Sequence, residues 1–116
     1  MALECARIAQ DQLADDILIL DLTDIESASF DYFVLCSGNS GVHVRAIVEA
    51  LRRRTKVNVD RLPVAEGAEA GVWVILDFFD VVVHVMQEET RKFYGLERLW
   101  GDARSLRIDD EGQLVA

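Results

Sequence analysis

The sequence predicts one domain of the α/β (α+β) class, with a mixed sheet of four or five strands flanked by helices. The 116 residues suit a single compact domain with one core. Hydrophobic residues make up 51% of the chain and there is one proline, so the chain can bury a core. Helical and strand patterns follow each other in the order helix, strand, strand, helix, strands, helix. We expect one domain over residues 1–116, with its core at about 2–103 and a C-terminal tail at 104–116.

The first third of the chain predicts a helix and two strands. Apolar residues recur at helical spacing from Ala2 to Leu13, which indicates a helix that buries one stripe. Every position from Ile17 to Leu20 is apolar, and this pattern is typical of a central strand covered on both faces. After a short polar connection, Asp31–Cys36 (DYFVLC) reads as a second strand.

A turn of small residues, SGNSG, leads into a second helix. Asn39 or Ser40 could cap its first turn, because short polar side chains accept hydrogen bonds from free N–H groups there. The apolar stripe of this helix comprises Val44, Ile47, Val48 and Leu51.

The second half predicts a loop, a hairpin and a short helix. Pro63, Gly67 and Gly71 indicate a loop from Asn58 to Gly71, preceded by a short strand at Val57–Val59. Val72–Leu76 and Val81–Met86 are strands joined by a hairpin-length connection. The last helix runs from about Glu88 to Tyr94 and ends at Gly95.

The charge balance favours a basic protein as partner. The net charge of -9 should repel a nucleic-acid phosphate backbone. A basic cluster comprises Arg52, Arg53, Arg54 and Lys56, but it lies at the end of the second helix, where cations favour the negative end of the helix dipole.

Cysteine usage indicates a reducing, cytoplasmic compartment. Cys5 and Cys36 form neither a disulfide framework nor a metal-spaced pair. No signal peptide or membrane span is predicted, since the apolar runs are too short. We therefore expect no cofactor, no metal and no membrane contact.

An enzymatic alternative starts from the SGNS turn between a strand and a helix. Backbone N–H groups of such a turn can bind phosphate, so Ser37 and Gly38 could hold a nucleotide. Asp77 and Asp80 could then bind magnesium, as in a nucleotidyl transferase. The turn lacks the lysine and the glycine spacing of a P-loop, and two aspartates beside a hairpin turn are commonly solvated.

Two histidines stand out, and neither supports a named reaction. Alternation along its strand places His84 with Val82 and Met86, opposite Val81 and Val83. Three readings stay open for His84, namely a structural hydrogen bond, a general base and part of a contact surface. His43 is expected to be a simple surface residue.

The C-terminal run contains more large apolar side chains than one narrow helical stripe can bury. We expect Phe93 and Leu96 to join the core. Trp73, Tyr94 and Trp100 are interface candidates, because large rings with a polar edge often anchor contacts. Acidic side chains that could steer a basic partner toward them are Glu88, Glu89, Glu97 and Asp102.

Over roughly Asp16 to Ala103 the chain resembles the ribosomal silencing factor family, also called RsfS or Iojap. The motifs are DYFVLCSGNSGVHVRAIVEAL, the EG pair at Glu66, and WVILDFFDVVVHVMQEETRKFYGLERLWGDA. Two positions depart from the family pattern. Phe79 stands where the family commonly has glycine in the hairpin turn, and Val42 replaces an arginine before His43.

The resemblance implies a nucleotidyltransferase-like fold without demonstrated transferase activity. It further implies binding to the large ribosomal subunit through its protein fourteen, which blocks subunit joining and represses translation when nutrients are scarce. Some family members form homodimers. The partner-binding candidates are Trp73, Asp77, Asp80, His84, Glu88, Glu89, Arg91, Tyr94, Glu97, Trp100 and Asp102.

Overall fold

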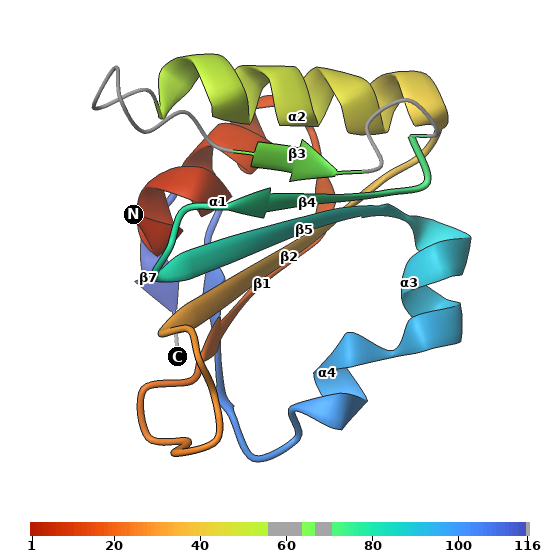
Figure 1. Cartoon of the computed structure of the whole chain (residues 1–116). Coiled ribbons are helices and arrows are strands. Elements are labelled where there is room, and N and C mark those ends of the chain that lie inside the picture. Colours follow the sequence, from red (N-terminus) through yellow and green to blue (C-terminus); the bar gives the residue numbers. More distant parts are fainter. Residues whose placement is uncertain (56–63, 67–70, 116) are drawn as a thin grey trace.

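A mixed sheet with helices on both faces organises the chain (Figure 1). The structure is a computed structural model that describes residues 1–55, 64–66 and 71–115. The strands are β1 (Asp15–Asp21), β2 (Tyr32–Gly38), β3 (Val64–Glu66), β4 (Trp73–Asp77), β5 (Val81–Gln87), β6 (Arg104–Ile108) and β7 (Leu114–Val115). The helices are α1 (Ala2–Asp11), α2 (Gly41–Arg54), α3 (Glu88–Tyr94) and α4 (Leu96–Leu99).

The strand order is β3-β4-β5-β2-β1-β6-β7. Strands β2 and β5 run parallel, and the other neighbouring pairs are antiparallel. The α+β class is therefore confirmed, but the predicted strand count of four or five is too low. The missed strands β3, β6 and β7 are short and lie toward the sheet edges, so they lack the continuous apolar run of a central strand.

Two segments differ from the expected organisation. Residues 104–115 form β6 and β7 instead of a tail, and β6 pairs with β1 and buries Leu106. Strand β3 lies inside the segment predicted as a loop. The strand predicted at Val57–Val59 falls outside the described residues, as does most of that loop.

The first core lies between the sheet and the helices α1 and α2. Helix α1 contributes Cys5, Ala6, Ile8 and Ala9. Helix α2 contributes the predicted stripe Val44, Ile47, Val48 and Leu51, together with Ala50. The sheet side includes Val81, Val83 and Val85, so this face of β5 is the valine face that alternation predicts.

The second core lies on the opposite face of the sheet, under α3, α4 and the connection from β1 to β2 (Figure 1). Its buried members are Leu18, Leu20, Leu22, Phe33, Leu35, Val82 and Met86. Since Ile19 faces the first core, β1 is covered on both faces, as its uninterrupted apolar run predicts.

Helix α2 begins at a side-chain cap and is tied to α1 by a histidine. Ser40 is the N-cap, and its hydroxyl accepts a hydrogen bond from the backbone N–H of His43 at 3.1 Å. The ring of His43 accepts from the Asn39 N–H at Nδ1 (3.0 Å) and donates from Nε2 to the Gln12 carbonyl (2.8 Å). His43 is therefore a link between two helix ends, and not the simple surface residue that we expected.

The hairpin turn between β4 and β5 holds a phenylalanine in a glycine-like conformation. Phe79 has φ = 74°, and the N–H of Asp80 donates to the carbonyl of Phe78 at 3.0 Å across it. A positive φ at the centre of such a three-residue turn is rare and strained for a residue with a side chain. The Asp77 carboxylate accepts from the Phe79 N–H at 2.8 Å and helps to hold this turn.

Within the residues that the structure describes, no helix combines the length and the apolar character required to span a bilayer.

Candidate functional site

The candidate site is built around residues 88–100, which we call the arm. The arm follows β5 directly and comprises α3, Gly95 and α4 (Figure 1). Glu88 and Glu89 lie in the first turn of α3, where acidic side chains favour the positive end of the helix dipole. Gly95 ends α3 with φ = 55°, the left-handed conformation that glycine adopts at low cost, and turns the chain into α4. The predicted bounds of α3 are therefore confirmed.

The inner face of the arm packs on the second core. Leu96 and Trp100 lie partly buried against it, as expected for Leu96. The Trp100 ring meets Phe33 edge-on, with centroids 5.6 Å apart. Trp73 at the start of β4 is also partly buried against this core. Both tryptophans, which we expected to be interface anchors, thus contribute much of their area to packing.

His84 sits beneath this packing as a neutral hydrogen-bond acceptor. Trp73 donates from its indole Nε1 to His84 Nδ1 at 3.1 Å, so the remaining ring nitrogen, Nε2, carries the proton. Nε2 is buried and has no hydrogen-bond partner among the described residues, and the Phe33 ring lies edge-on to the imidazole at 4.9 Å. Burial lowers the pKa of His84 to about 4. Of the three readings of His84, these contacts favour the structural one.

Arg91 is enclosed by the protein, contrary to the expectation that it contacts a partner directly. Its side chain is 8% exposed and forms an ion pair with Glu97, from Nε to Oε1, at 2.6 Å. The same guanidinium donates to the hydroxyl of Ser37 at 3.0 Å and to the carbonyl of Asp16. Burial acts to raise the pKa of Glu97, but the hydrogen bond and the positive charge from Arg91 outweigh it and hold this pKa below its ordinary value.

The arm also carries the exposed apolar side chains Phe93, Tyr94 and Leu99, which we call the outer triad. Their exposures are 82%, 52% and 73%. Phe93 meets Tyr94 edge-on at 5.1 Å, and Tyr94 packs against Trp73 at 4.8 Å. The expectation that Phe93 joins the core is therefore wrong, while Tyr94 is exposed as an interface candidate should be.

Helix phase explains why the expectation for Phe93 was wrong. In a helix, a residue two positions along points to nearly the opposite side. Because Arg91 faces the sheet, Phe93 must face solvent. A buried arginine could not be anticipated from the pattern, since arginine normally lies at the surface.

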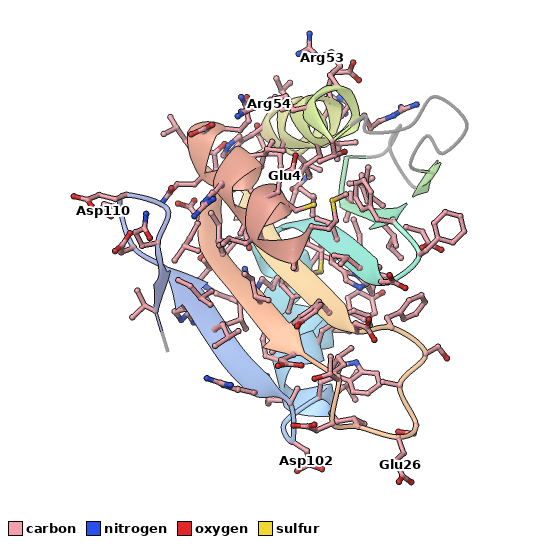
Figure 2. The ribbon with its side chains drawn as sticks, turned by 90° about the vertical axis from the view of Figure 1, so that its left-hand side faces the viewer. Glu4, Glu26, Arg53, Arg54, Asp102 and Asp110 are labelled. Carbon is pink, nitrogen blue, oxygen red and sulfur yellow. The ribbon has the colours of Figure 1, made fainter. Side chains whose placement is uncertain are left out.

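The acidic candidates fall into two groups. Glu88, Glu89 and Asp102 are exposed on or next to the arm, and Glu88 pairs with Lys92 at 3.1 Å. Asp77 and Asp80 lie at the hairpin turn, at the opposite end of β5 from the arm. Figure 2 shows Asp102 and Glu26 at one end of the molecule and Arg53 and Arg54 of α2 at the other. The basic end of α2 is thus well separated from Asp102.

The residues of the enzymatic alternative do not converge. Ser37 aligns with Met86 at one end of β5, whereas Asp77 aligns with Val82 four residues away, roughly 13 Å along the strand. The Ser37 hydroxyl is also occupied by Arg91. Among the described residues, no group of three or more His, Cys, Asp or Glu side chains is arranged to hold a metal ion.

Comparison with known proteins gives a consistent assignment. A family model described as "Ribosomal silencing factor during starvation" matches residues 1–115. The ribosomal silencing factor RsfS of Bacillus subtilis is 39% identical over 104 residues, which cover 90% of this chain and 87% of that protein. The mouse protein named mitochondrial assembly of ribosomal large subunit protein 1 is 38% identical over 90 residues, covering 75% of this chain and 39% of that protein.

Solved structures agree with the sequence matches. A crystal structure of a protein from Chromobacterium violaceum superposes with a TM-score of 0.74 at 35% identity, covering 86% of this chain and 80% of that one. A second, from Bacillus halodurans, gives a TM-score of 0.70 at 30% identity and covers 98% and 95%. In both sequence and fold, this chain belongs to the ribosomal silencing factor (RsfS) family.

Proposed function

We propose that this protein represses translation by binding protein fourteen of the large ribosomal subunit, which prevents the small subunit from joining. Membership of the RsfS family supports a regulatory role on the ribosome. The name of the mouse relative also refers to the large subunit. The observation that carries the proposal is the outer triad, because several exposed large apolar side chains within one short segment are typical of a protein contact. We place this action in the cytoplasm.

The outer triad supplies the anchors of the contact. An aromatic side chain can bury about 150–250 Å² when it is fully covered. Because Tyr94 is half exposed and Leu99 is smaller than an aromatic residue, the triad supplies about half of the roughly 800 Å² that a specific contact needs per partner. The exposed acidic side chains Glu88 and Glu89 on α3 and Asp102 just after the arm would supply part of the remainder. Trp73 packs against Tyr94 and is itself held by His84, while Trp100 packs on Phe33, and only the exposed part of each tryptophan would reach the partner.

Charge favours a basic protein over ribosomal RNA as the principal contact. The net charge is -9, and the exposed carboxylates beside the triad would repel phosphate groups. The same carboxylates attract lysine and arginine side chains and should speed association with a basic ribosomal protein. Asp77 and Asp80 would take part if the partner extends along the hairpin toward its turn.

Repression by this mechanism requires no bond chemistry. A bound domain occupies volume that the small subunit needs, so the two binding events exclude each other. The coupling is reciprocal, because each ligand lowers the affinity of the large subunit for the other by the same factor. Excess small subunits should therefore displace the protein from large subunits.

Co-sedimentation with separated subunits tests the proposal. We expect binding to free large subunits, weak binding to small subunits, and release when small subunits are added. The double variant Phe93→Gln, Leu99→Gln should reduce affinity by about tenfold or more while the free energy of unfolding stays close to that of the parent, since both side chains are exposed.

Val42→Gln is the matched control, because Val42 is an equally exposed apolar residue on α2, on the other side of the sheet. This variant should bind as the parent does. If the double variant binds large subunits as tightly as the parent does, the triad is not part of the contact. Failure of the folded parent to bind large subunits would reject the function itself.

A further inference from the structure

The arm is attached to the sheet in an unusual way, through a buried charge. Arg91 is the buried residue of α3, and α4 has no buried residue. A short helix on a sheet is ordinarily held by an apolar stripe. Here Leu96 and Trp100 pack against the second core but are only partly buried, so the polar contacts of Arg91 add to the attachment of the arm.

The Arg91 guanidinium joins the two helices of the arm to each other and the arm to two strands of the sheet. Through Nε it binds the carboxylate of Glu97, which begins the next helical turn of the arm. Through its terminal nitrogen it binds the Ser37 hydroxyl near the end of β2 and the Asp16 carbonyl in β1. Asp16 lies where the β1–β2 register shifts, between Asp15 and Leu18, so its carbonyl is outside the regular ladder.

The hydrogen bonds of Arg91 fix the orientation of the arm as well as its attachment to the sheet. A guanidinium is planar and presents its donors in a rigid fork, so acceptors on three elements restrict how α3 can rotate about its own axis. Rotation of α3 would carry Phe93 and Tyr94 with it, because they lie two and three residues beyond Arg91. The contact between Tyr94 and Trp73 would then be lost as well.

We propose that Arg91 is a positioning residue, which holds the arm in the orientation that presents the outer triad to the partner. The inference rests on the proposed function for its binding consequence. The orientation of the arm can nevertheless be measured in the isolated protein.

Amide hydrogen exchange of the full chain is the first test. In Arg91→Met we expect residues 88–100 to exchange at least about tenfold faster than in the parent, because a lone Glu97 carboxylate remains and the arm opens locally. Amides of β2 and β5 should keep their protection. Lys92→Met is the matched control, since its exposed ion pair with Glu88 holds no other element, and it should leave the arm protected.

Binding to large subunits is the second test. Arg91→Met should weaken binding although the outer triad is intact. Because Arg91 acts through the triad, its effect on affinity should not add to that of Phe93→Gln. A variant that combines Arg91→Met with Phe93→Gln should bind little worse than whichever single variant has the lower affinity. Arg91→Lys keeps the charge but not the fork, so we expect partial protection and partial affinity.

Several results would overturn the inference. One is that the amides of the arm exchange in Arg91→Met at the same rate as in the parent. Another is that the losses of binding free energy from Arg91→Met and Phe93→Gln are strictly additive. If Arg91→Met unfolds, Glu97→Ala and Ser37→Ala take its place in the exchange test, because each removes one acceptor of the Arg91 guanidinium. Faster exchange confined to the arm would support positioning, whereas equal loss throughout the sheet would reject it. If the parent fails to bind large subunits, the exchange result still decides the role of Arg91 while the proposed function fails.

Discussion

Protonation of His84 should make this protein lose stability in mild acid. The folded structure requires the neutral form of the His84 ring, since the Nδ1 atom that accepts a hydrogen bond from Trp73 cannot accept it once Nδ1 carries a proton. Burial lowers the pKa of His84 from 6.5 to about 4. In the unfolded chain the ring titrates near its ordinary value, so at a pH between these two values the unfolded state binds more protons than the folded state.

The sign and size of the effect follow from linkage. Stability rises with pH wherever the unfolded state binds more protons, so this contribution is present above pH 6.5 and is lost as the pH falls toward 4. At 1.36 kcal/mol per pH unit, the full loss is about 3 kcal/mol, of which about 2 kcal/mol falls between pH 7 and pH 5.

Urea unfolding at a series of pH values, followed by circular dichroism, measures the effect. The control is His84→Gln, which cannot titrate in this range but can still accept from the Trp73 indole. His43 and all the carboxylates are common to both proteins, so their contributions cancel in the difference. The free energy of unfolding of the parent should fall by about 2 kcal/mol more than that of His84→Gln between pH 7 and pH 5. Parallel curves over this range, or a His84 pKa near 6.5 by NMR titration, would refute the reasoning.

Two further predictions concern the hairpin turn and the cysteines. Phe79→Gly should raise the free energy of unfolding by about 1 kcal/mol in urea denaturation, because glycine relieves the strain of φ = 74°. Phe79→Ala keeps the Cβ atom and the strain, so an equal gain in this variant would contradict the explanation. Burial raises the pKa of the Cys5 and Cys36 thiols to about 12, so both should react with a thiol reagent at pH 8 only at the rate at which the protein unfolds. Labelling of native protein at the rate of a free thiol would show that one of them is reachable.

The elements that could be predicted from the sequence are those with a strong periodic pattern. The apolar stripe of α2 and the alternation in β5 each repeat over several residues, so their type and facing agree with the structure. The cap at Ser40 and the stop at Gly95 depend on local backbone chemistry, which is also visible in the sequence. The sequence did not predict β6 and β7, because β6 is stabilised by pairing with the distant strand β1 and the two-residue β7 pairs in turn with β6.

The candidate site was predictable as a region but not side chain by side chain. Aromatic and acidic residues after β5 indicated a contact surface, and Tyr94 and Glu88 are indeed exposed. Phe93 and Arg91 reverse the ordinary burial preferences, because the phenylalanine ring is exposed and the guanidinium is buried. The burial of Arg91 depends on hydrogen-bond acceptors from Asp16 and Ser37, which only the tertiary structure brings together.

The unequal cover of the two sheet faces explains why this short region needs so many large rings. One face is covered by α1 and the fourteen-residue α2, whose small and branched side chains suffice to fill the first core. The other face is covered by the seven-residue α3, the four-residue α4 and a loop. Few residues can seal such a face only if each covers a large area, which tryptophan does best. Trp73 covers His84 and Trp100 covers Phe33, so the exposed side chains of the outer triad are left free to meet a partner. A partner contact built on this arm therefore uses side chains that the core does not need, so substitutions in the outer triad can change binding with little effect on folding.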